Sequence, residues 1–155
     1  MQDSGIELIS EAGFRRYEVS AYSQPGYQSQ HNLNYWLFGD YLGIGAGAHG
    51  KFSDPDTGLI KRTRKKRQPA HYLASELSRL AEVNPVLPEE RTLEFLLNSL
   101  RLVEGFCVYD YEARTGVGFS HIAKQVESLC DRGLLTKKND SCLLYTSDAA
   151  DDQAC

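Results

Sequence analysis

The sequence lacks the features that would assign it to several special classes of protein. No apolar run approaches the roughly 18 residues that a membrane-spanning helix needs. The opening residues hold no basic stretch followed by an apolar one, so no signal peptide is visible. The cysteines form no CxxC pair and show no metal-ligand spacing; they are Cys107, Cys130, Cys142 and Cys155. These absences predict free thiols and a cytoplasmic location.

An excess of positive charge is also missing. The formal net charge is −4, and the 41% hydrophobic and 25% charged residues are typical of a globular protein. This balance argues against a dedicated nucleic-acid binder. Six of the seven residues of KRTRKKR at 61–67 are nevertheless basic. Such a run is typical of a solvated strand or loop, and the alternative is that it faces an anion such as a phosphate or a ligand carboxylate.

The first third of the chain predicts a helix followed by a strand. Apolar residues at helical spacing favour a helix over 3–12, which Gly13 ends, and the β-forming content of 14–21 favours a strand. This order is typical of an α/β unit. Pro25 and Gly26 then predict a turn, so we expect residues 28–36 to be a loop or an extended segment.

A glycine-rich segment follows at 40–50, with the sequence DYLGIGAGAHG. Its apolar residues Tyr41, Leu42 and Ile44 predict a short strand that runs into the glycines. A dinucleotide fingerprint would need a helix directly afterwards, whereas 51–58 predicts a hairpin turn, so that assignment is rejected. The glycines then serve either a tight strand exit or a loop that contacts a ligand.

The second half of the chain predicts mainly helices. Leu73, Leu77 and Leu80 favour a helix from about residue 69, and the proline-containing stretch 83–91 favours a linker. A stronger helix is expected before Gly105, with apolar positions Leu93, Leu96, Leu97, Leu100 and Val103.

The remainder predicts a helix and a hairpin. Ile122, Val126 and Leu129 mark a helix that Gly133 ends, and a strand begins at 134–135 before a turn at Asn139 and Asp140. Helices followed by a hairpin favour a small winged-helix-like module at about 89–141, a pattern that specifies no function.

Several separated motifs occur in a fixed order: YEVS at 17–20, PGY at 25–27, HNxxYW at 31–36, GDYLG at 39–43 and GxGAH at 45–49. Together they resemble the HemW group of the oxygen-independent coproporphyrinogen III oxidase family, whose members are radical SAM proteins. RTLEFLLNSLRLVEG at 91–105 and VESLCDRGLL at 126–135 resemble the C-terminal domain of that family. The resemblance covers about residues 1–141.

The resemblance implies a fold of the α/β plus α+β class. We expect the C-terminal edge of a partial TIM-like radical SAM barrel with its hairpin at 1–68, a helix and linker at 69–88, and a HemN C-terminal-like, small helical winged-helix-like domain at 89–141. Residues 142–155 show no helical or strand period. They resemble a translated sequencing-library adapter, so we expect a non-native tail.

The resemblance also implies a [4Fe–4S] cluster on a CxxxCxxC loop and bound S-adenosylmethionine. This sequence has no CxxxCxxC, and the early barrel strands are absent as well. We therefore expect a C-terminal fragment that holds no metal for a cluster and is inactive alone, with both cofactors bound by the full-length parent.

In the resembling group the HNxxYW segment is associated with haem. Its residues His31, Asn32, Tyr35 and Trp36 are therefore the candidate haem-binding residues, with His31 as the possible iron ligand. A neutral imidazole ligates iron well, Trp36 and Tyr35 offer flat apolar area, and Asn32 could orient the imidazole. The alternative is that His31 caps a loop and Trp36 fills the barrel bottom or its junction with the C-terminal domain.

The second candidate site follows the glycine strand. In related oxidases the matching position lies by S-adenosylmethionine, so Gly45, Gly47, Ala48 and His49 are the candidate cofactor-binding residues, and His49 could equally be a second haem ligand. Glu18 lies where a strand would end at the barrel mouth, where we expect a structural role. No catalytic residue is assigned.

Three functions remain open at this point. The first is a radical SAM haem chaperone that delivers haem to respiratory haem proteins, with possible peripheral membrane association of the parent. The second is an oxygen-independent coproporphyrinogen III oxidase, which oxidatively decarboxylates propionates in porphyrin biosynthesis. The third is a nucleic-acid-binding winged helix, which the acidic net charge disfavours. HNxxYW favours the first, with haem or porphyrin as partner and no nucleic acid.

Overall fold

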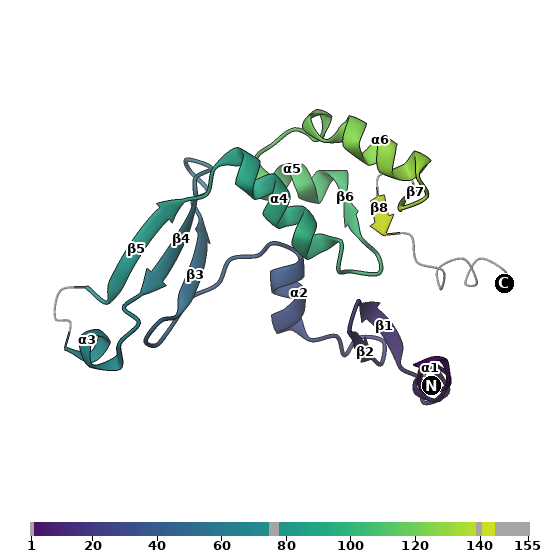
Figure 1. Cartoon of the computed structure of the whole chain (residues 1–155), viewed down its shortest axis with the longest axis horizontal. Helices are drawn as coiled ribbons and strands as arrows, with labels where there is room; N and C mark the ends of the chain where they lie inside the picture. Colours follow the sequence, from purple (N-terminus) through teal and green to yellow (C-terminus); the bar gives the residue numbers. More distant parts are fainter. Residues whose placement is uncertain (1, 75–77, 139–140, 145–155) are drawn as a thin grey trace. The chain divides into compact units, whose positions relative to one another are not determined.

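The computed structural model describes residues 2–74, 78–138 and 141–144. The chain divides into two compact units, of which one comprises Met1–Phe38 with Glu94–Cys155 and the other comprises Gly39–Leu93. The boundary falls within helix α4 (Pro88–Ser99). Figure 1 shows the helices and strands of both units.

The first unit begins with helix α1 (Gln2–Glu11), followed by strands β1 (Arg15–Glu18) and β2 (Ala21–Ser23). The helix agrees with the apolar period, and Gly13 takes a φ of +81° beyond its end. The single strand expected over 14–21 is wrong: β1 and β2 form an antiparallel hairpin with a register irregularity between Arg16 and Glu18. The segment therefore forms two short strands that pair with each other, and not one continuous strand.

Residues 30–36 are a helix, which corrects the expected loop. Helix α2 (Gln30–Trp36) begins after Ser29, whose hydroxyl oxygen accepts a hydrogen bond from the backbone N–H of Asn32 at 3.3 Å. Serine is a favoured N-cap because its oxygen satisfies a donor that the first helical turn leaves free. Ser29 is therefore a local sequence feature that indicates the start of this helix.

The rest of this unit forms a small helical domain with a three-stranded sheet. Its further elements are β6 (Phe106–Cys107), α5 (Val108–Thr115), a 3-10 turn (Phe119–His121), α6 (Ala123–Asp131), β7 (Leu135–Lys138) and β8 (Ser141–Leu144). The strand order is β6-β8-β7, and all pairs are antiparallel. The helix and strand around Gly133 agree with the prediction, whereas the turn expected at 139–140 lies outside the described residues.

Strand β8 corrects the expectation that no strand lies beyond residue 141. Cys142 pairs with both Phe106 of β6 and Lys137 of β7, and Leu144 pairs with Leu135. Residues 142–144 therefore belong to the sheet, and the expected tail from 145 onward lies outside the described residues.

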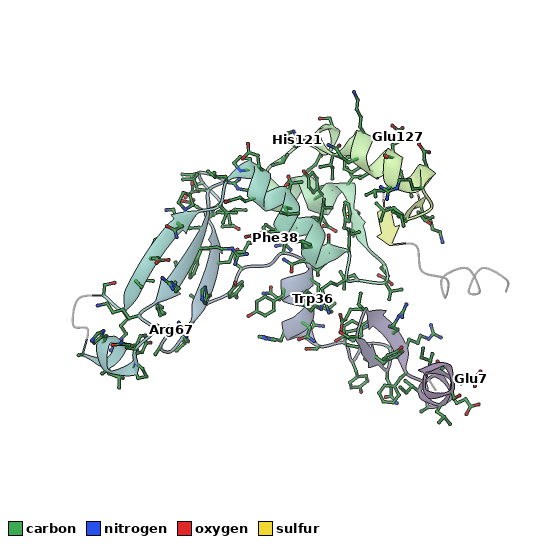
Figure 2. All side chains as sticks on the ribbon, in the orientation of Figure 1. Glu7, Trp36, Phe38, Arg67, His121 and Glu127 are labelled. Carbon is green, nitrogen blue, oxygen red and sulfur yellow. The ribbon has the colours of Figure 1, made fainter. Side chains whose placement is uncertain are left out.

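An aromatic cluster forms the core of this domain. Phe95 of α4 is 2% exposed, and its ring packs edge-to-face against Phe106 and Tyr111 with centroid distances of 5.4 Å. Phe38, labelled in Figure 2, follows α2. The centre of its ring lies 6.0 Å from the centre of the Phe95 ring. Such aromatic pairs add to the apolar area that they bury.

The second unit is built on an antiparallel sheet of order β3-β4-β5, with β3 at His49–Ser53, β4 at Ile60–Lys65 and β5 at Leu80–Pro85. The hairpin turn expected over 51–58 is present only from residue 54 onward, because 51–53 belong to β3, and most of the basic run lies on β4. The helix expected from 69 to 80 is wrong, because α3 covers only Pro69–Leu73 and Leu80 pairs with Lys65 in the sheet.

The strand expected at Tyr41, Leu42 and Ile44 is also not formed. Tyr41 makes a single bridge to Lys51, whereas Leu42 and Ile44 are exposed. The overall class is nevertheless mixed α and β, as expected. The described strands form three separate antiparallel sheets and no closed barrel.

Candidate functional site

The HNxxYW segment lies on α2, where helical spacing distributes its side chains over two neighbouring faces. His31 and Tyr35 are four residues apart, and their rings meet edge-to-face with centroids 5.0 Å apart. Asn32 and Trp36 share the adjacent face by the same spacing. Because residues one apart on a helix do not face each other, Asn32 is poorly placed to orient the imidazole of His31.

His31 is exposed, so a nitrogen of its imidazole is accessible to a ligand. Tyr35 beside it is half-buried, and its ring stands at 77° to the imidazole. An exposed imidazole with a flanking aromatic ring fits the needs of an axial iron ligand beside a porphyrin.

Trp36 is held differently, under the guanidinium of Arg101. The Cζ atom of Arg101 lies 4.4 Å from the centre of the Trp36 ring, which is a cation–π distance. The indole Nε1 is buried and has no hydrogen-bond acceptor. Trp36 therefore packs against the segment that follows α4.

Arg101 also contacts the buried carboxylate of Glu18. Its Nη2 lies 3.2 Å from Oε2 of Glu18 and donates to Oγ of Ser20 at 3.2 Å. The hydroxyl of Ser20 donates to the same carboxylate at 3.0 Å. Glu18 is thus held by an ion pair and a hydrogen bond, which is a structural role. Arg101 was missed by sequence reasoning, since 83 residues separate it from Glu18 and no local pattern marks it.

A cavity of about 640 Å³ lies on another side of α2. Leu33 of α2 and Leu37, just after the helix, line it, but His31, Asn32, Tyr35 and Trp36 do not. The other lining residues come from the β1–β2 hairpin, the β2–α2 turn, the α4–α5 connection and α5, and include Arg15, Tyr17, Val103, Phe106 and Cys107. A ligand bound to His31 on α2 would therefore lie outside this cavity.

The thiol of Cys107 in that cavity wall is poorly suited to act as a ligand or nucleophile. Burial and the hydrogen bond that the thiol donates to Asp110, at 2.9 Å, raise the pKa of Cys107. A raised pKa keeps the sulfur protonated, whereas metals and electrophiles require the thiolate.

The glycine segment of the second unit is explained by close backbone packing. Gly47 has a φ of +73°, and its N–H donates to the carbonyl of Lys66 at 2.9 Å. The N–H of Lys65 donates to the carbonyl of Ala48 at 2.8 Å, and the N–H of Gly45 donates to the hydroxyl of Tyr72 at 3.3 Å. The segment is thus fastened to β4 and α3.

His49 begins β3 and is exposed, in register with Arg64 of β4. A Cβ on Gly43 would lie 2.1 Å from the carbonyl oxygen of His49, so glycine is required there by the approach of two backbones. The candidate cofactor residues Gly45, Gly47, Ala48 and His49 thus lie within five consecutive positions, and among these four His49, at the start of β3, is the exposed one.

The described residues do not fit an iron–sulfur cluster. Among them, no group of three or more histidine, cysteine, aspartate or glutamate side chains is arranged to hold a metal ion. Cys107 and Cys130 are free thiols. In the same part of the chain, no helix has both the length and the apolar character needed to span a membrane.

The comparison with known proteins assigns the family. The model of the HemN C-terminal domain matches residues 86–144. The chain is 42% identical over 138 residues to the heme chaperone HemW of Escherichia coli, an alignment that covers 89% of this chain and 36% of that protein. The heme chaperone HemW of Haemophilus influenzae is 40% identical over 139 residues, covering 90% of this chain and 36% of that protein.

A solved structure is similar in fold. Coproporphyrinogen III oxidase (HemN) from Escherichia coli, described as a radical SAM enzyme, matches with a TM-score of 0.59 and 11% identity, covering 92% of this chain and 36% of the other. Identity this low shows the fold alone. The chain spans about 36% of the length of these bacterial relatives. By its sequence, the chain belongs to the HemW-type proteins.

Proposed function

We propose that this chain supplies the haem-binding helix of a HemW-type haem chaperone, with His31 as the iron ligand. The observation that carries the proposal is the arrangement of α2, which exposes His31 beside the Tyr35 ring while Trp36 is held by Arg101. Similarity to proteins named heme chaperones supports it, because haem is then the cargo.

Three residues of α2 would have different roles in binding haem. The imidazole of His31 would donate a nitrogen lone pair to the iron, which requires the neutral form of the ring. Tyr35 would offer apolar area at the edge of the porphyrin. Trp36 would hold the helix in place and would border the macrocycle rather than stack fully on it, since Arg101 covers one face of its ring.

The wider activity of a HemW-type protein is part of the same proposal. Transfer of haem to respiratory proteins, and the [4Fe–4S] cluster and S-adenosylmethionine of the family, would depend on residues beyond those that this structure describes. Within the second unit, His49 is the residue we propose to face S-adenosylmethionine. The N–H groups of Gly45 and Gly47 are already used by Tyr72 and Lys66.

Haem titration of the chain tests the role of His31. Absorbance in the Soret region is followed for the wild type, His31→Ala and the control His121→Ala, which removes another exposed histidine of the same unit. His31→Ala should weaken binding and shift the Soret band, because the iron loses its imidazole ligand. His121→Ala should leave both unchanged.

Fluorescence gives a second readout, since Trp36 is the single tryptophan of the sequence. Haem bound on α2 should quench its emission. An unchanged Soret band and affinity in His31→Ala would remove His31 as the ligand, and His49→Ala would then be tested. Absence of both binding and quenching in the wild type would refute the proposed function of this chain.

A further inference from the structure

Arg101 connects three parts of the first unit that are far apart in sequence. Its guanidinium pairs with Glu18 of β1, donates to Ser20 and covers the ring of Trp36 on α2. Its backbone carbonyl accepts a hydrogen bond from the N–H of Val19 at 2.9 Å. One side chain therefore joins the β1–β2 hairpin and the haem-binding candidate helix to the HemN C-terminal domain.

Helix α2 is short, with seven residues, and buries none of its own side chains. A helix this short is unstable by itself in water and depends on tertiary contacts for its position. Leu33 and Leu37 line the cavity of about 640 Å³ instead of packing in a core. Phe38 anchors the chain just after the helix, and the contact between Trp36 and Arg101 acts on the helix itself and restrains its rotation about its axis.

The rotation of α2 sets the direction in which His31 projects. Because successive helical residues turn by about 100°, a small rotation of the helix moves the imidazole away from a bound iron. We propose that Arg101 is a positioning residue for haem: it fixes α2 through Trp36 so that His31 and Tyr35 face the macrocycle. This inference rests on the haem-binding role proposed above and assigns Arg101 no contact with haem.

The partner of Arg101 makes a simple substitution ambiguous. Glu18 is 3% exposed, and Arg101→Gln would leave its carboxylate without a counter-charge, which lowers stability by itself. The double variant Glu18→Gln/Arg101→Gln leaves no buried charge and should regain much of the lost stability. It still lacks the guanidinium over Trp36, so it separates positioning from charge neutralisation.

The experiment compares the wild type, Arg101→Gln, the double variant and the control Arg132→Gln, which removes an exposed arginine of the same domain. Each is measured by thermal melting, Trp36 emission and haem titration. We expect Arg101→Gln to melt earlier than the wild type. Both variants that lack Arg101 should show red-shifted Trp36 emission, and should bind haem about tenfold more weakly, equivalent to about 1.4 kcal/mol. Arg132→Gln should match the wild type.

The outcomes distinguish this inference from the proposed function. A wild type that binds no haem refutes the proposed function and the inference with it. A wild type that binds haem, together with a double variant of unchanged affinity and Soret band, overturns only the positioning role. Weakened binding in a double variant that melts like the wild type supports positioning, since lost stability cannot then explain the weaker binding.

Discussion

The ammonium group of Lys51 is buried and lies 3.0 Å from Oδ1 of Asp40, with side chains 2% and 42% exposed respectively. Asp40 also accepts hydrogen bonds from the backbone N–H of Ser53 at 2.7 Å and from its hydroxyl at 2.9 Å. The neighbouring Tyr41 pairs with Lys51 through the backbone. This ion pair therefore fastens the start of the glycine segment to β3.

Replacing Asp40 and replacing Lys51 should lower the stability of the protein by different amounts. Asp40→Asn leaves the buried Lys51 without its carboxylate, and we expect a loss of about 1–3 kcal/mol in the free energy of unfolding. Lys51→Met replaces the buried charge with an apolar chain and leaves Asp40 in contact with water, so its cost should be below about 1 kcal/mol. Urea denaturation of the two variants gives the comparison. A larger loss for Lys51→Met would contradict the assignment of Lys51 as the costly partner.

The same pair predicts a loss of stability in acid. Burial raises the pKa of Asp40, but the hydrogen bonds from Ser53 and Lys51 and the charge of Lys51 outweigh it and hold the pKa below its ordinary value of 3.8. A carboxylate with a lowered folded-state pKa stabilises the protein fully above its unfolded pKa, and this contribution disappears as pH falls through the folded value.

The difference in stability between the wild type and Asp40→Asn should therefore shrink below about pH 4. Melting temperatures across that range measure it. The pKa of Asp54 is also lowered, by hydrogen bonds from Thr57 and the N–H of Asp56, and Asp54 is intact in both proteins, so the difference isolates Asp40. A difference that is constant with pH would show that Asp40 does not contribute as an anion.

The aromatic cluster should dominate the stability of the first unit. Phe95→Ala removes a ring that is 2% exposed and packs against Phe38, Phe106 and Tyr111, so we expect a loss of about 3–5 kcal/mol. Leu97→Ala is the matched control on the same helix, with a side chain that is 66% exposed and an expected change within about 0.5 kcal/mol. Chemical denaturation followed by Trp36 fluorescence tests both; equal losses would contradict the placement of the core.

Truncation of the chain before or after β8 should have different effects on stability. Removal of 141–155 takes away β8, which pairs with both β6 and β7, so we expect a loss above about 2 kcal/mol, since each net backbone hydrogen bond contributes about 0.5–1.5 kcal/mol. Removal of only 145–155 keeps every residue that matches the HemN C-terminal domain, and should change stability by less than about 0.5 kcal/mol. Thermal melting of the two truncated chains and of the full chain measures both losses. Equal losses in the two truncated chains would contradict the role of β8.

Local sequence patterns were sufficient to predict a helix where its formation depends on residues close together in the sequence. The spacing of Ile122, Val126 and Leu129 before Gly133 predicted α6, because an amphipathic period and a glycine after the helix act within a few residues of each other. The order of short motifs was likewise enough to identify the family. Ser29 could have indicated α2 as well, since its N-cap contact spans only three positions.

Pairing between distant segments was decided only by the tertiary structure. Leu80 fits the helical spacing of Leu73 and Leu77, yet it lies in β5, because hydrogen bonds to β4 outweigh local periodicity. Arg101 and Glu18 are 83 residues apart, and only folding shows that the buried carboxylate takes this arginine as its partner. The sequence by itself thus determined the family and singled out the HNxxYW segment as a candidate site. The tertiary structure decided which side chains of α2 are exposed and what holds them, because burial and ion pairing depend on contacts that no local period encodes.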